Sequence, residues 1–294
     1  MLLIFVITMK HKRSITILTI LIVIISAVTT SFGIFSSGGP GVFDYESIRG
    51  EVVKIYGQGV YRHMSADVAI QGIAQDYVTL FIGIPLLLIS LVYYRRNSIK
   101  AGFVLSGTFL YFLVTFMFYT AMGMYNIMFL GYVALFGLSF FALFLSLFSF
   151  KIADIPAMFS AKAPSKPVGI FLMVNAILIA LLWLGEVVPP LLDGSIYPAG
   201  LDHYTTLIVQ GFDLGLLLPI SFVVGLLLKR KMATGYLFGI PYIVFLSLLM
   251  TALTAKIIAM GLAGVNIIPA VIIIPVVNVF AVVCAVLMIR CIAD

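Results

Sequence analysis

Two stretches of the chain place amide and carboxyl side chains beside long apolar segments. They are Gln71–Asp76 and Gln210–Asp213, and each is followed by an apolar run that contains a proline and ends in a basic cluster. A carboxyl group carried into hydrocarbon costs on the order of 3 kcal/mol or more, so acids are kept there mainly for function. Asp76 and Asp213 are therefore the first candidates for substrate-binding or coupling acids.

The depth of these acids follows from where their helices begin. Asp202 resembles an N-cap, which puts Asp213 roughly 16 Å below the outer end of its helix at 1.5 Å per residue. If the other helix begins near Ser65, Asp76 lies equally deep, and the two carboxylates occupy matching places. Two acids in one site cannot both ionise cheaply, so one is expected to hold a proton near neutral pH. The alternatives are a helix-capping role for Asp76 and an interhelical hydrogen bond for Asp213.

Further polar side chains lie near the same helix ends. Glu186 closes the fifth apolar segment and either joins an outer cavity or is an ordinary interfacial acid. Gln71, Gln75 and Gln210 either orient the acids and bind a polar substrate or link one helix to another. Lys256 either snorkels to the outer interface or serves as a counter-ion to one of the acids.

The composition is that of a polytopic membrane protein. The hydrophobic fraction is 63%, and charged residues make up only 10% of the chain. The formal net charge of +6 comes from basic residues between apolar runs, so topology explains it better than binding to nucleic acid, which we exclude. The three histidines lie far apart, and Cys284 and Cys291 form no CxxC pair, so we expect no metal and no cofactor. Nucleotide-binding loops and catalytic serine motifs are also absent from the sequence.

Eight apolar segments are each about as long as a bilayer crossing requires. The first, Ile15–Phe35, follows a basic cluster and is interpreted as an uncleaved helix, although a signal peptide is the alternative. Whether Met1 or Met9 is the true start stays open. The sequence predicts an all-α integral membrane protein whose remaining helices lie at about 74–94, 100–122, 126–150, 167–188, 204–228, 233–260 and 267–289.

The charges predict the orientation of these helices. With the N-terminus inside, most of the 17 basic residues fall on the cytoplasmic side and most of the 11 acids on the other. This distribution obeys the positive-inside rule and places both termini in the cytoplasm.

A weak internal repeat divides the chain into two four-helix halves, residues 1–150 and 151–294. Their first helices run in the same direction, so the repeat is parallel, about an axis along the membrane normal. In such architectures a site commonly lies where the halves meet. Chance similarity between apolar helices is the alternative.

One outer loop, residues 36–65, is long. It alternates polar and apolar residues, which is typical of a strand-like or interfacial segment, and it ends in Tyr61, Arg62 and His63. This loop is predicted either to form a lid over the bundle or to be a surface loop anchored by its aromatic residues.

Several of these segments together resemble a known group of proteins. The runs are 56–62 (YGQGVYR), 75–80 (QDYVTL), 183–186 (WLGE) and 212–214 (FDL). They are similar to a family of uncharacterised prokaryotic multi-pass membrane proteins, sometimes loosely labelled permeases, over most of the chain from about Arg49 onward. The resemblance implies the membrane class and no substrate or catalytic residue.

The leading functional hypothesis is a cell-membrane carrier or permease for a small solute, coupled to protons or cations through its acids. The alternatives are a sensor or assembly protein that binds a lipid or ligand in an outer cavity, an intramembrane enzyme acting on a lipid or quinone, and a permease subunit driven by a separate ATPase. Expected partners are membrane lipid, a small-molecule solute and a second copy or partner subunit. No residue is assigned a catalytic role.

Overall fold

The computed structural model describes residues 10–293 and contains eight helical spans long and apolar enough to cross a membrane. The predicted all-α, eight-helix membrane fold is confirmed, while the question of Met1 or Met9 falls outside the described residues. Six spans are single helices and two are interrupted. The spans are α1 (Lys12–Phe35), α2–η2–α3 (Ala66–Val78, Thr79–Gly83, Ile84–Arg95), α4 (Ile99–Ala121), α5 (Phe129–Leu147), α6 (Ser165–Asp193), α7–η5–α8 (Ile208–Phe212, Asp213–Leu217, Leu218–Lys229), α9 (Ala233–Leu262) and α10 (Ala270–Arg290).

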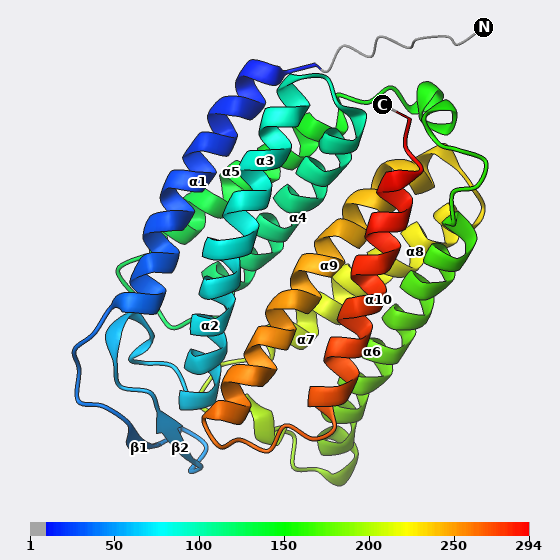
Figure 1. Ribbon diagram of the computed structural model, residues 1–294. Helices are drawn as coiled ribbons and strands as arrows, with labels where there is room; N and C mark the ends of the chain where they lie inside the picture. Colours follow the sequence, from blue (N-terminus) through cyan, green and yellow to red (C-terminus); the bar gives the residue numbers. More distant parts are fainter. Residues whose placement is uncertain (1–9, 294) are drawn as a thin grey trace, which may run out of the picture.

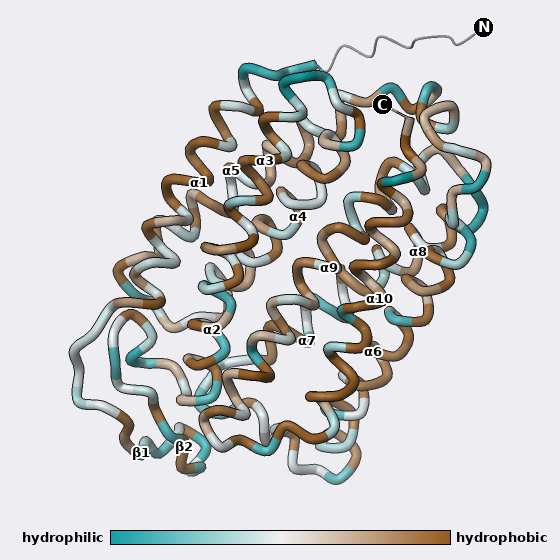
Figure 2. The backbone as a smooth tube through the Cα atoms, viewed as in Figure 1, coloured by the Kyte–Doolittle hydropathy of each residue, from teal (hydrophilic) through white to brown (hydrophobic). Residues whose placement is uncertain are grey.

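Hydrophobic residues cover the middle of the helices, and hydrophilic stretches gather at the two ends of the bundle (Figure 2). Large apolar side chains on the outside of α6 and α10, such as Leu181, Leu192 and Ile272, are 60% or more exposed. A helix that is apolar on its outward face as well as its inward face fits a lipid environment rather than water.

The helices form two groups that lie side by side (Figure 1). Helices α1 to α5 make one group and α6 to α10 the other, and α9 packs against both α4 and α2 across the boundary between them. We call the end with Arg95 and Lys229 the inner end, because the charge pattern assigns it to the cytoplasm. The opposite end is the outer end, and it carries the loop of residues 36–65.

The outer loop contains a two-stranded antiparallel hairpin of β1 (Phe43–Glu46) and β2 (Val52–Ile55), followed by the short helix η1 (Gly59–Tyr61). The strand-like interpretation of this segment is thus confirmed. Two further short helices lie in loops, η3 (Ile152–Met158) at the inner end and η4 (Ala199–Leu201) at the outer end.

Helix α2 begins at Ala66, which confirms the start near Ser65 and lies earlier than the apolar run from about residue 74, and α7 begins at Ile208 instead of about residue 204. Asp202 is not an N-cap, because it lies in the preceding loop with φ 51°. Asp76 is the tenth residue after the start of α2 and Asp213 only the fifth after the start of α7, so the two acids do not hold equal positions along their helices.

Candidate functional site

Both interrupted spans contain a π-helical turn at the point of interruption. In the first, the N–H of Ile84 donates to the carbonyl of Thr79, and in the second, the N–H of Leu218 donates to the carbonyl of Asp213. A proline follows each turn at the start of the next helical segment, Pro85 and Pro219. Proline cannot donate to the helical ladder and its ring crowds the preceding turn, so a wider turn at this place relieves the conflict. Such turns are frequent at functional sites.

The features after each π turn recur at the same interval along the chain. The turns begin at 79 and 213, and the next helices begin at 99 and 233. Asn97 and Lys231, which precede those helices, both adopt the left-handed conformation. In this register Asp213 is the equivalent of Thr79, and Gln210 is the equivalent of Asp76. The two acids therefore do not occupy matching places, and Asp213 lies about one turn nearer the inner end.

Two asparagines extend the correspondence to the last helix of each half. Asn126 accepts a hydrogen bond from the Met128 N–H at 2.8 Å, and Asn266 accepts one from the Ile268 N–H at 3.1 Å. Each asparagine lies in the outer turn before α5 or α10. The same side chain at the same place closes the same turn in both halves.

Asp76 is enclosed among α1, α2, α4 and the outer loop. Its side chain is 1% exposed and accepts hydrogen bonds from the hydroxyls of Tyr61, at 2.5 Å, and Tyr119, at 3.1 Å. Burial raises the pKa of Tyr61, which lies in the outer loop, so this residue remains a neutral donor. On the α1 side, the absence of a side chain at Gly33 makes room for the carboxylate.

A second set of buried polar groups surrounds the first π turn. The amide of Gln75 donates to the hydroxyl of Tyr111 at 2.8 Å and to that of Thr115 at 3.4 Å. Thr79 and Tyr111 exchange a further hydrogen bond at 2.9 Å. Because all these groups have partners, Gln75 works here as a link between α2 and α4.

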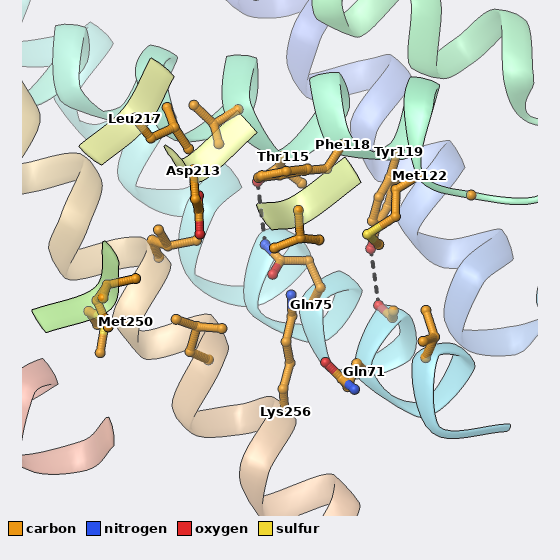
Figure 3. Close-up of a pocket in the computed structure, with 18 of the residues that line it drawn as sticks. Gln71, Gln75, Thr115, Phe118, Tyr119, Met122, Asp213, Leu217, Met250 and Lys256 are labelled. Atoms are coloured by element: carbon orange, nitrogen blue, oxygen red, sulfur yellow. Dashed lines mark hydrogen bonds between the residues drawn. The ribbon is translucent and has the colours of Figure 1, made fainter. Parts of the chain in front are cut away.

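A cavity of about 350 Å³ lies between the two halves and reaches from the outer end toward the middle of the bundle (Figure 3). Its wall is mainly apolar and aromatic, and it includes one lysine and one aspartate. The polar residues on the wall are Tyr61, Gln71, Gln75, Thr115, Tyr119, Asn126, Tyr132, Asn175, Trp183, Asp213, Tyr242 and Lys256.

Asp213 faces this cavity from the second π turn (Figure 3). Its carboxylate accepts a hydrogen bond at 2.8 Å from the indole N–H of Trp183 on α6. Within residues 10–293, this is the hydrogen bond that fixes the side chain, and the rest of the carboxylate is partly exposed to the cavity. Asp76, by contrast, lies behind Tyr61 and Tyr119 and does not contribute to the wall.

Lys256 extends from α9 into the cavity, with its ammonium toward Gln75 (Figure 3). It interacts electrostatically with both Asp76 and Asp213. Among the described residues, however, it makes no hydrogen bond and no ion pair within 4.0 Å. The lysine therefore lies within electrostatic range of two acids that it does not touch, and its side chain extends into the cavity instead of snorkelling to the interface.

The other predicted site residues lie elsewhere. Glu186 and Gln210 form a separate pair, in which the glutamine amide donates to the carboxylate at 3.4 Å, and neither side chain lines the cavity. Arg62 and His63 are exposed on the outer loop, next to Tyr61. Gln71 lies on the cavity wall.

Sequence reasoning did not single out Trp183, Tyr119 or Tyr132 as site residues. The signal for Trp183 was its place one turn before Glu186 in the only tryptophan-containing segment. Tyr119 and Tyr132 lie on long apolar helices where aromatic residues are common, so nothing in their spacing distinguishes them. The hydroxyl of Tyr132 is buried and has no hydrogen-bond partner among the described residues, although Asn126 lies close to it.

Below the cavity, the interface between the halves is closed by tight packing. A Cβ on Gly107 of α4 would lie 2.5 Å from the Cβ of Val244 and 2.7 Å from the carbonyl oxygen of Pro241 on α9. Nearer the inner end, the ring of Phe159 stacks on Tyr236 of α9 and packs edge-on against Phe103 of α4. These contacts, which we call the inner seal, bring the two halves close together on this side.

At the outer end, the loops of the two halves are joined by polar contacts. The guanidinium of Arg49 donates to the carbonyls of Asp202 and Tyr204. The Ser65 N–H donates to the hydroxyl of Tyr204 at 3.1 Å. Burial raises the pKa of Tyr204, so this hydroxyl stays neutral. These contacts form a latch, which we define as Arg49 with Ser65, Asp202 and Tyr204.

Comparisons with protein-family models, with curated proteins and with solved structures give no match. In the part of the chain that the structure describes, no group of three histidine, cysteine, aspartate or glutamate side chains is placed to hold a metal ion. The arrangement instead provides one ammonium, one carboxylate and several hydroxyl and amide groups around an apolar space. Groups of these kinds are able to bind a small polar or charged molecule.

Proposed function

We propose that the protein is a carrier of the cell membrane, and that a small solute binds in the cavity between its two halves. The observation that carries this proposal is the pair formed by Lys256 and Asp213, two charged side chains that face an apolar space without touching each other. Charged groups inside a bundle are expensive and typically mark a path for substrate or ions.

The surroundings of the cavity favour transport over simple storage of a ligand. A carrier must open its site first to one side and then to the other, by rocking one half against the other. The inner seal, made by Gly107 against α9 and by Phe103 against Phe159, and the outer latch at Arg49 lie on opposite sides of the cavity. Each is made of contacts between the halves, so each is able to break without disrupting either half.

The two π turns give the lining helices places to bend. Asp213 is itself the first residue of the second turn, so bending there moves the acid relative to Lys256 on α9. Binding of a solute to both side chains would therefore couple to the angle of α8 against α7. Coupling of this kind requires that the solute bind the two conformations with different affinity.

The test is uptake into proteoliposomes that contain the purified full-length chain. An isotope-labelled metabolite extract is supplied outside, and the solutes retained inside are identified by mass spectrometry. The variants are Asp213→Asn and Lys256→Gln, and the matched control is Glu186→Gln, which removes an acid from the same half outside the cavity.

At least one solute is expected to accumulate in wild-type and Glu186→Gln liposomes and to fall about tenfold or more in the two cavity variants. Binding of a solute without any uptake would overturn the carrier and favour a membrane sensor. Conversion of a solute into a product would point to an intramembrane enzyme instead.

A further inference from the structure

The two charges on the cavity wall restrict what the cavity accepts. Lys256 offers three donors and no acceptor, and Asp213 offers several acceptor positions, of which Trp183 uses one. The remaining residues that line the cavity carry neutral side chains. The wall is thus electrically balanced, but its positive and negative groups are held more than 4.0 Å apart.

Separated charges in an apolar cavity are costly to leave without partners. A ligand with a single anionic group would satisfy Lys256 but would be repelled by Asp213. A ligand with a single cationic group would satisfy Asp213 but would be repelled by Lys256. A ligand that carries both charges satisfies both side chains and adds no net charge to the site.

The size and lining of the cavity limit the size of the ligand and the polarity of its uncharged part. A volume of about 350 Å³ is near the lower end of the range for small-molecule sites and is too small for a membrane lipid. The wall also includes Phe118, Phe245, Leu246 and Leu249, which match an apolar body.

We infer that the cavity binds a small zwitterion with an apolar body, whose carboxylate meets Lys256 and whose ammonium meets Asp213. The inference rests on the proposed function, since it names the class of solute that the carrier would move. Its test, however, measures binding to the purified chain and does not depend on transport.

The probes share the isobutyl side chain of leucine and differ in the charged or polar groups attached to it. L-Leucine is the zwitterion, isopentylamine the cation, isocaproate the anion and isopentyl alcohol the neutral control. Thermal unfolding of the full chain in detergent is followed against the concentration of each probe, because a ligand that binds the folded state raises its stability. L-Phenylalanine with phenethylamine and hydrocinnamate repeats the series with an aromatic body.

The zwitterion is expected to bind wild type at least about tenfold more tightly than either singly charged analogue. Lys256→Gln should lose the response to isocaproate and keep that to isopentylamine, and Asp213→Asn should do the reverse. Lys256→Arg keeps the charge and should keep the preference for the zwitterion. If a variant does not fold, the ranking of the four probes on the wild-type protein still tests the inference.

Equal stabilisation by isopentyl alcohol and L-leucine would overturn the inference, as would stronger binding of isocaproate or isopentylamine than of the zwitterion. No stabilisation by any probe would overturn it as well. Zwitterion binding without uptake into liposomes would leave the inference standing and remove the carrier function. Uptake of a solute that is not a zwitterion would support the carrier function and contradict the inference.

Discussion

The acids of the two interrupted spans lie in opposite surroundings although the backbone around them is built alike. Asp76 is 1% exposed, receives two tyrosine hydroxyls and is covered by Gly33 of α1. Asp213 receives one indole N–H and faces the cavity. The difference arises because the acids are one helical turn apart in register, so the same π turn hides one carboxylate and presents the other. The first half therefore holds a sealed acid, and the second supplies the acid and the lysine on the cavity wall.

The largest loss of stability is expected when a side chain fills the space beside the buried carboxylate of Asp76. In Gly33→Ala, the new Cβ would overlap the nearer carboxylate oxygen of Asp76 and lie 3.1 Å from the hydroxyl of Tyr61. Since Asp76 is held by both tyrosines, it cannot move away without breaking a hydrogen bond. We expect a loss of about 3 kcal/mol in stability, measured by thermal unfolding in detergent.

The matched control lies in the second π turn. A Cβ on Gly215 would meet no atom within 4 Å, so Gly215→Ala should change stability by less than about 1 kcal/mol. Equal losses in Gly33→Ala and Gly215→Ala would show that the first half is not packed around its acid.

The second prediction removes the donors that seal Asp76. Tyr61→Phe and Tyr119→Phe each leave the buried carboxylate with one hydrogen bond fewer, and such groups cannot reach water. Each substitution should cost about 1–3 kcal/mol of stability. The combined variant should cost less than the sum, because both hydroxyls serve the same carboxylate. A pair of neutral single variants would mean that Asp76 is reached by water.

The fold could be predicted from the sequence because it depends on long apolar runs and on the basic clusters at their ends. Apolar length determined the eight spans, and basic clusters such as Arg95-Arg96 marked their inner ends. The boundary of α2 was missed because Ala66, Asp67 and the following amides are polar enough to resemble a loop. They form a helix nonetheless, since the outer loop and α9 cover them.

For the candidate site, the sequence predicted which polar residues matter but not which way their side chains point. Asp213, Gln71 and Gln75 stood out because polar residues are rare in such segments, and all three line the cavity. The direction in which a side chain points depends on the π turns, because one extra residue in a turn rotates the helix before it relative to the helix after it. The sequence therefore did not separate the sealed Asp76 from the open Asp213, or reveal that Lys256 points inward.

The third prediction removes the hydrogen-bond donor of Asp213, as the second removed those of Asp76. Trp183→Phe removes the hydrogen bond to Asp213, but the carboxylate still faces the cavity and can be hydrated there. The loss of stability should be about 1 kcal/mol, smaller than for Tyr61→Phe. A larger loss than that of the tyrosine variants would reverse the assignment of sealed and open sites.

The smallest effect is expected at the one hydroxyl of the first half that lines the cavity and, among the described residues, has no partner. Tyr132 is 3% exposed and makes no hydrogen bond within that part of the chain. Removing an unsatisfied buried hydroxyl costs no hydrogen bond, so Tyr132→Phe should leave the stability of the empty protein within about 0.5 kcal/mol of wild type. Tyr111→Phe is the contrasting variant, since its hydroxyl bonds both Gln75 and Thr79, and it should cost about 1–3 kcal/mol. If Tyr132→Phe were as destabilising as Tyr111→Phe, that hydroxyl would be structural. The sealed region would then extend to the cavity wall itself, leaving Lys256 and Asp213 as the groups available to a ligand.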